Sequence, residues 1–413
     1  MSRVAAPASR TPRRPSDGTR AVRAVRWSAG VSAFGDGTFR SASPLLAAAL
    51  NPDPRAVALV AMGTFAGWLT GPWCGALTDR LPRRTVLLWA NAARGLVLGL
   101  FLVLLAIGYG SIAALTVAAF VITVGNVFSD AAAQALLPTM LGTGVADLAR
   151  QNGKLAMAET TGRSLLGLPL GSAAFGLSRL APVAAHLVSF AGAAAVAAAV
   201  PREPPAPARP ARSLHADIAG GLAHLVRDRS LLAMSGLVAA FNFADTVAMS
   251  VFVLYAGQRL GVTAGAYGLL LTALAIGSVA GGWLGGRVAA RVRWPWVQLA
   301  VFLGQGAAWT VVACAGSVWP VAAALVVMGA ASTVGTVCVV STRQARVPNQ
   351  LLGRVIAGFR VLGNGAGLLG AFAGGVLAAH LGIAAVPWCT AGLLMVFALP
   401  LAGYLMRRRS VAA

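Results

Sequence analysis

Long apolar stretches alternate with short polar ones along the whole chain. A helix needs about 20 mostly apolar residues to cross a membrane, and twelve stretches meet that requirement. They lack the alternating ten-residue pattern of a membrane barrel, so we predict helices. The predicted spans are residues 27–50, 56–78, 84–107, 111–137, 156–178, 181–200, 231–256, 264–286, 295–316, 318–341, 354–378 and 383–406.

Composition points to the same class of protein. Of the 413 residues, 58% are hydrophobic and 11% are charged, and the mean hydropathy is +0.76. A soluble globular protein needs far more charge to cover its surface. The sequence therefore predicts an all-α integral membrane protein.

The net charge of +22 would suggest nucleic acid binding in a soluble protein, but here the arginines alternate with the predicted topology. The N-terminal tail, the even-numbered loops and the C-terminus are rich in arginine, whereas the odd-numbered loops hold only Arg55, Arg179 and Arg259. By the positive-inside rule both termini are cytoplasmic, which requires an even number of spans. We expect a multi-pass protein of the inner or plasma membrane that contacts lipid and binds no nucleic acid.

The spans divide the chain into two halves. We predict a cytoplasmic basic tail at 1–26, a six-helix bundle at 27–200, a linker at 201–230, a second six-helix bundle at 231–406 and a cytoplasmic tail at 407–413. The proline-rich run 201–210 cannot be helical and predicts an extended linker. Apolar residues from Leu214 to Val226 then recur at helical spacing, which predicts an amphipathic helix along the cytoplasmic membrane face.

The two halves repeat each other. Phe34-Gly35-Asp36 recurs as Phe243-Ala244-Asp245 (245 − 36 = 209), and a Gly75–Arg84 segment after the second span has a counterpart that begins at Gly282 (282 − 75 = 207). Secondary transporters are often built from two such halves, with the substrate site between them.

Glycines recur every four residues on the second, fifth, eighth and eleventh spans. Such faces let helix backbones approach closely. We expect them to pack the two bundles against each other, or to reflect the ordinary glycine content of membrane helices. The expected packing glycines are Gly67, Gly71, Gly171, Gly281 and Gly367.

The stretch from Gly75 to Leu87 resembles motif A of the major facilitator superfamily, with Asp79, Arg80, Arg83 and Arg84 at the signature positions. The resemblance implies two six-helix bundles joined at spans two, five, eight and eleven. Further segments, among them Ser129-Asp130-Ala131, resemble the branch of drug, macrolide and siderophore exporters. The branch implies proton coupling, although the fourth span lacks the arginine that many drug/proton antiporters carry near the position of Asn126.

Motif A also implies a gate. In the superfamily its acid meets the N-terminal end of the eleventh helix, and its arginine meets an acid on the fourth. On this chain Asp79 would face the helix that begins near Gly353, and Arg83 would bridge Asp79 and Asp130. A carboxylate is stabilised at a helix N-terminus in any case. The expected gating residues are Gly75, Asp79, Arg80, Arg83, Arg84 and Asp130.

Charges inside the predicted spans cost roughly 2.5–3.5 kcal/mol each on insertion scales and mark candidate functional residues. Asp36 and Arg40 lie four residues apart and so do Glu159 and Arg163, a spacing that allows two intrahelical ion pairs. Asp245 has no nearby cation on its own span. Alternatively, Asp36 and Asp245 occupy matched positions that face a central cavity, where they bind protons or a cationic substrate.

In this fold spans one, four, seven and ten line the central path. The side chains expected there are Asp36, Arg40, Asn126, Phe241, Asn242, Asp245, Ser332 and Thr336. An aromatic, weakly polar surface with isolated acids favours a small amphipathic molecule, neutral or cationic, over a sugar or a dianion.

The sequence contains no catalytic grouping and no phosphate-binding motif. We therefore predict no enzyme activity, no cofactor and no metal, and a monomeric secondary transporter that exports drugs, antibiotics or siderophores with the proton as coupling ion. An importer of a small metabolite and a non-transporting membrane receptor or scaffold remain the alternatives.

Overall fold

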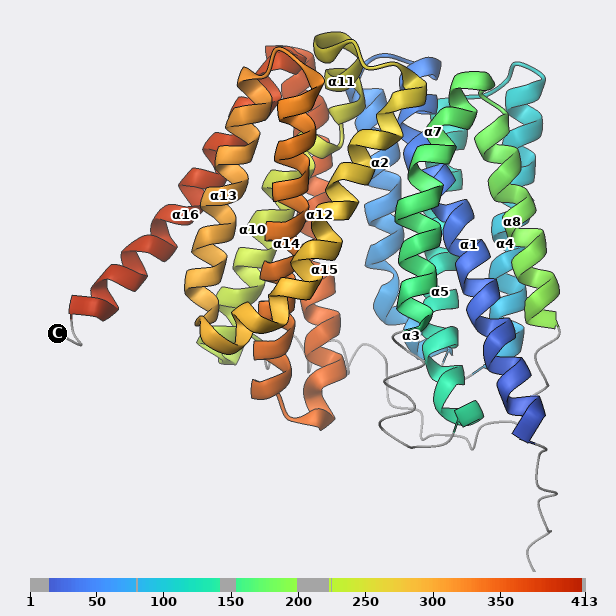
Figure 1. The fold of residues 1–413 in the computed structure, drawn as a ribbon, viewed down its shortest axis with the longest axis horizontal. Coiled ribbons are helices and arrows are strands. Elements are labelled where there is room, and N and C mark those ends of the chain that lie inside the picture. The colour runs from blue at the N-terminus through green and yellow to red at the C-terminus, as the bar shows by residue number, and fades with distance from the viewer. Residues whose placement is uncertain (1–14, 79–80, 142–153, 199–222, 224, 411–413) are drawn as a thin grey trace, which may run out of the picture.

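The computed structural model describes residues 15–78, 81–141, 154–198, 223 and 225–410. Within these residues each of the twelve predicted spans has a helical counterpart, and the all-α prediction is confirmed. Eight helices are long and apolar enough to cross a membrane, and a bent pair adds a ninth. The remaining spans stand beside them in the same two bundles (Figure 1).

The first bundle contains the helices of the N-terminal half. Figure 1 shows them side by side in blue and green. They are α1 (Pro15–Leu50), α2 (Pro54–Leu69), α3 (Gly71–Thr78), α4 (Arg83–Ala106), α5 (Ile112–Leu141), the π-helical η1 (Thr161–Gly167), α7 (Leu168–Leu177) and α8 (Ala181–Ala198).

The second bundle repeats this arrangement with the C-terminal half. It comprises α10 (Arg229–Met249), α11 (Phe252–Leu260), α12 (Ala264–Arg291), α13 (Trp294–Cys314), α14 (Val318–Arg346), α15 (Asn349–Leu381), the short η2 (Ile383–Ala385) and α16 (Val386–Ser410). Helix α16 runs outward beyond the rest of its bundle (Figure 1).

The second span is broken near its middle. Helices α2 and α3 meet at Thr70 with a bend of 41°. Pro72 has no backbone N–H and its ring crowds the preceding turn, so an uninterrupted helix is unfavourable there. Helix α2 packs extensively on α15 of the second bundle, whereas α3 touches it only slightly and leads into motif A.

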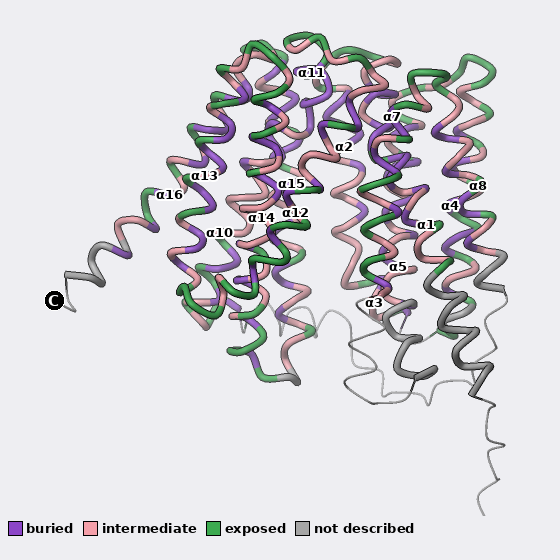
Figure 2. Tube along the Cα trace, viewed as in Figure 1, coloured by how far each residue is buried: buried purple, intermediate pink, exposed green. Residues whose placement is uncertain are grey.

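The two ends of the molecule differ in charge. Helix α1 begins and α16 ends at one end, where the connections carry Arg291, Arg293 and Arg346; we call this the basic end. At the other end the connections are short, as at 51–53, 178–180 and 261–263. Buried positions gather at that other end, around α11, α2 and α7 (Figure 2).

The bundles meet at the end opposite the basic end. Helix α2 packs on α15, and α7 packs on α12. Arg55 at the start of α2 approaches His380 at the end of α15, with 3.0 Å between Arg55 Nη2 and His380 Nε2. The buried Ser172 hydroxyl donates to the Gly265 carbonyl and accepts from the Gly268 N–H, each at 3.0 Å. Two polar contacts therefore hold this end closed.

Toward the basic end the matching surfaces are apart. A Cβ added at Gly71 or Gly75 of α3, or at Gly353 of α15, would meet no atom within 4 Å. Those positions lie beyond the α2–α3 bend and at the first turns of α15. Among the described residues, the bundles are therefore apart at these positions of the basic end and packed together at the other end.

Most of the glycines expected between the bundles lie elsewhere. Gly67 faces Thr123 of α5, Gly171 faces Thr38 of α1, and Gly281 faces Ala330 of α14, each within its own bundle. Gly71 faces open space. The prediction is corrected for these four, because Gly67, Gly171 and Gly281 pack helix pairs inside one bundle and Gly71 has no neighbour to pack against.

Gly367 does face the other bundle, where a Cβ would lie 2.5 Å from the Phe65 ring of α2. The four spans expected at the interface therefore form it, although mainly through other residues.

The amphipathic helix expected in the linker falls largely outside the described residues. Near its end, Leu225 is fully buried in a cluster with Leu231 and Met234 of α10 and Phe359 of α15. This end of the segment therefore packs on the second bundle, and the position of the helix along the membrane face stays a prediction.

Candidate functional site: a charged pocket inside the first bundle

A polar pocket lies within the first bundle, toward its basic end. Its volume is about 620 Å³ including space open to solvent, and α1, α4, α5, α8 and the helical residues 154–160 with η1 surround it. Five of its lining residues are charged. The lining residues are Ser28, Ala29, Ser32, Ala33, Asp36, Leu87, Asn91, Arg94, Asn126, Ser129, Asp130, Glu159, Arg163 and Ala193.

Asp36 of α1 is the best-partnered acid in the pocket. Its carboxylate lies 3.6 Å from Arg163 Nη2 and 3.3 Å from His186 Nε2, and it accepts a hydrogen bond from Asn126 Nδ2 at 3.2 Å. The Asp36 side chain is 10% exposed. Side chains from three other spans therefore satisfy one carboxylate.

The ion pair expected between Asp36 and Arg40 does not form in the structure. Arg40 is exposed one turn along α1, and Arg163 takes its place. The expected pair of Glu159 with Arg163 is likewise absent, because Arg163 turns to Asp36. Neighbouring helices, and not the i+4 position of the same helix, supply the partners.

Arg94 of α4 stands at the centre of the pocket although the sequence reasoning passed over it. It is 1% exposed. Its guanidinium donates to Asn126 Oδ1, to Asn91 Oδ1 at 2.5 Å, to Ser129 Oγ at 2.9 Å and to its own helix at the Ala90 carbonyl.

The Arg94 guanidinium also lies 4.5 Å from the centre of the Phe190 ring, in cation–π range. The signal for Arg94 was present in the sequence as a lone arginine in the middle of the third apolar stretch. Span four lacks an arginine near Asn126, but Arg94 of span three lies beside Asn126 in the structure.

His186 of α8, one of four histidines in the chain, was also not among the predicted site residues. It is fully buried between the rings of Phe39 and Phe190, at centroid distances of 5.3 and 4.2 Å. Its Nε2 faces Asp36, and its Nδ1 has no hydrogen-bond partner. The sequence does not indicate which carboxylate a histidine within an apolar span will contact.

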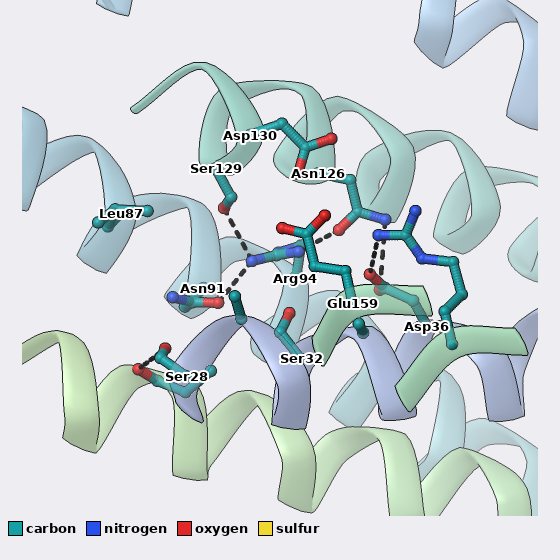
Figure 3. A pocket seen from close by; sticks show the side chains of 14 residues that line it. Ser28, Ser32, Asp36, Leu87, Asn91, Arg94, Asn126, Ser129, Asp130 and Glu159 are labelled. Atoms are coloured by element: carbon teal, nitrogen blue, oxygen red, sulfur yellow. Dashed lines mark hydrogen bonds and ion pairs between the residues drawn. The ribbon is translucent and has the colours of Figure 1, made fainter. Parts of the chain in front are cut away.

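Asp130 and Glu159 line the pocket without ion pairs. Among the described residues neither carboxylate has a cationic nitrogen within 4.0 Å. Figure 3 shows both carboxylates pointing into the space in front of Arg94. Asp130 feels the charges of Arg163 and Arg94 and, from α15 of the second bundle, of Arg360.

The local backbone makes room for these side chains. Arg163 lies in the π-helical segment η1, and such segments often occur at functional sites. A Cβ at Gly37 would lie 2.1 Å from the Arg163 carbonyl oxygen, so only glycine lets α1 and η1 approach this closely. A Cβ at Gly125 would lie 2.5 Å from Arg94 Cγ and Cδ.

The motif A residues can be placed only in part. Asp79 and Arg80 lie outside the described residues, as do the side chains of Arg83 and Arg84 at the start of α4. Gly75 lies in α3 next to open space. The bridge from Arg83 to Asp130 thus falls outside the described part, and Asp130 itself turns into the pocket.

The candidate residues of the second bundle do not join the pocket. Asn242 donates to the Gly363 carbonyl of α15 at 3.1 Å, and Phe241 packs edge-on to Phe302. Ser332 and Thr336 bond carbonyl groups of their own helix. Asp245 lies beside the indole of Trp309, whose buried N–H has no well-aligned acceptor.

Within the described residues no three His, Cys, Asp or Glu side chains are arranged to hold a metal ion.

Two helical bundles, the first of which contains a charged pocket, are an architecture typical of secondary transporters. The family model described as Major Facilitator Superfamily matches residues 27–246, which is more than half of the chain. The chain therefore belongs to the major facilitator superfamily. No curated protein matches the sequence significantly.

Solved structures share the fold at low sequence identity. The nucleoside transporter NupG matches at a TM-score of 0.76 and 11% identity, over 93% of this chain and 98% of that one. A bacterial homologue of the iron transporter ferroportin, in its inward-facing state, matches at 0.73 and 14%, over 94% and 98%. A bacterial homologue of the lysosomal transporter Spinster, also inward-facing, matches at 0.71 and 13%, over 95% and 97%.

Proposed function

We propose that this protein is a proton-coupled secondary transporter that exports small amphipathic molecules, neutral or cationic, by alternating access. The charged pocket of the first bundle carries the proposal. Each intramembrane charge costs roughly 2.5–3.5 kcal/mol on insertion scales, and the pocket holds five. A merely structural bundle has no need of them, whereas a site that exchanges ions does.

The closed and open ends of the molecule support alternating access. By the positive-inside rule the basic end is cytoplasmic, which makes the described state inward-open. Ser172 and Arg55 then belong to an outer contact that must part when the protein opens outward. Motif A, at the basic end, is the proposed inner gate, with Asp79 and Arg83 closing against the start of α15.

Asp36 is the proposed coupling residue, because it lies within the pocket and is held by groups that respond to its charge. Protonation of the carboxylate would weaken its pairing with Arg163 and free that side chain. Asp245, which has no cation beside it, is the proposed second acid. The direction of transport rests on the resemblance to exporters; import of a nucleoside-like or other metabolite is the competing outcome.

The test is gradient-driven transport in proteoliposomes. A thermal-shift screen against antibiotics, siderophores and amines first selects a substrate. Wild-type protein should move it against its gradient when a proton gradient is imposed. Asp36→Asn should reduce this accumulation by about tenfold or more, with passive exchange less affected.

Asp53→Asn is the matched control, because it removes an exposed carboxylate and keeps an N-cap residue. Undiminished proton-driven transport in the Asp36→Asn/Asp245→Asn double variant would contradict coupling through these acids. Accumulation in right-side-out vesicles in the inward direction would identify an importer.

A further inference from the structure

The described lining of the pocket contains more acids than bases. Its lining contains the acids Asp36, Asp130 and Glu159 and the bases Arg94 and Arg163. With every group ionised, three negative and two positive charges leave a net charge of −1. Among the described residues of the lining, such a surplus is costly in low-dielectric surroundings, and a bound cation would remove it.

The surplus is located at Asp130 and Glu159. Asp36 is already surrounded by Arg163, His186 and Asn126. Arg94 gives its N–H groups to the neutral oxygens of Asn91, Asn126 and Ser129 and to a backbone carbonyl. Neither arginine therefore forms an ion pair with Asp130 or Glu159.

These two carboxylates act on one another. Both line the same pocket and face the same space in Figure 3, so each is exposed to the other's negative charge. Arg360 of α15 contributes a positive charge to Asp130 from a distance but does not line the pocket. A cation placed between the two carboxylates would relieve their repulsion and neutralise the pocket.

Building on the proposed function, we propose that Asp130 and Glu159 together bind the primary ammonium group of the transported molecule. An ammonium group has three N–H donors that need three acceptors. The two carboxylates supply two, and the Ser32 hydroxyl, which also lines the pocket, supplies the third.

The lining also excludes another class of cation. Quaternary ammonium groups have no N–H and are recognised by the faces of aromatic rings. No aromatic side chain is among the described residues that line this pocket. The site therefore selects hydrogen-bonding primary amines over permanently charged quaternary ones, and the proton is the occupant that an amine displaces.

The selectivity can be tested by equilibrium binding, without transport. Purified protein in lipid nanodiscs is titrated at neutral pH with phenylethylammonium and with its N-trimethyl analogue in a calorimeter. Wild-type protein should bind the primary amine about tenfold or more tightly than the quaternary one, a difference of about 1.4 kcal/mol. This comparison needs no variant and does not depend on how variants fold.

Two variants then locate the site. Asp130→Asn and Glu159→Gln should each weaken binding of phenylethylammonium about tenfold or more, and Asp53→Asn should leave it unchanged. Thermal unfolding of each variant verifies that it is folded.

Equal affinity for the two amines, no saturable binding of phenylethylammonium by the wild type, or unchanged binding in both folded pocket variants would overturn the assignment. Transport without amine selectivity would refute this inference alone, and amine binding without any transport would refute the proposed function alone.

Discussion

The two bundles share a fold but differ in their interiors. Asp36 in the first bundle lies among Arg163, His186 and Asn126. Its counterpart Asp245 (245 − 36 = 209) lies beside the Trp309 indole with no cation near it.

The position matched to Asn126 is Thr336 (336 − 126 = 210), whose hydroxyl bonds its own helix. In the second bundle Gln298 and Gln305 also donate to backbone carbonyls, at 3.1 and 2.9 Å. Polar groups there hold helices together, whereas in the first bundle they surround a pocket.

The comparison shows which features the two repeated halves share and which feature only one half has. Apolar span length and small-residue packing define the bundle, and both halves have them. A charged pocket needs acids and bases from several helices at once, and one half has accumulated them. The first bundle is therefore the one to which we assign coupling and amine binding, and the second bundle packs against it through α12 and α15.

The largest expected effect comes from removing the central cation of the first bundle. Arg94→Met should abolish transport and destabilise the protein by roughly 3–5 kcal/mol, because Asn91, Asn126 and Ser129 lose their hydrogen-bond donor and the pocket loses a buried positive charge. Unfolding in detergent, followed by tryptophan fluorescence, measures the change. Arg287→Met is the control, since Arg287 is exposed and lies over the exposed Trp283 ring at 4.2 Å. Wild-type stability in Arg94→Met would show that the network does not stabilise the bundle.

A smaller effect should distinguish two matched glycines, Gly125 and Gly335 (335 − 125 = 210). A Cβ at Gly125 would press on Arg94 at 2.5 Å, where the guanidinium is held by its hydrogen bonds and cannot yield. A Cβ at Gly335 would meet Val301 at 3.1 Å, a contact that a small shift relieves.

Gly125→Ala should thus cost roughly 1–3 kcal/mol and impair transport. Gly335→Ala should be better tolerated in both assays. Equal losses in the two variants would mean that packing, and not the position of Arg94, limits the first bundle.

The smallest expected effect concerns the contact between the bundles. Ser172→Ala removes the hydrogen bonds to Gly265 and Gly268 of α12, a net loss of about 0.5–1.5 kcal/mol. The population open at the basic end should fall by about two- to tenfold relative to the alternative state.

Spin labels on the basic ends of α5 and α14, in a variant without native cysteines, report this ratio by double electron–electron resonance. Ser41→Ala is the control, because the Ser41 hydroxyl donates to Thr38 of its own helix. An unchanged distance distribution in Ser172→Ala would show that the hydrogen bonds do not bias the equilibrium.

The helical spans could be predicted because the length and hydropathy of a membrane helix are properties of one segment. The early start of α1 at Pro15 could not, since its first turns are basic and not apolar. The π-helical turn around Arg163 was also missed, because it depends on the close approach of α1 at Gly37.

The candidate site could likewise be predicted only in part. Asp36, Asn126, Asp130, Glu159 and Arg163 could each be singled out as polar residues in apolar spans. Their partners could not be predicted, because helical periodicity relates residues of one helix and Asp36 is bonded by three others. Arg94 could have been singled out as an arginine within an apolar span. Its hydrogen bonds to Asn126 and Ser129 of another helix could not have been predicted.

The glycines around the pocket have a consequence for how the protein tolerates mutation. Gly35 faces Ser189 and His186, and Gly37 and Gly125 face Arg163 and Arg94, all within 3 Å of where a Cβ would stand. A saturation library scored for growth would therefore find these positions as intolerant as the charged ones, although they carry no chemistry. In such data the glycine positions would mark the site as clearly as the charged positions do.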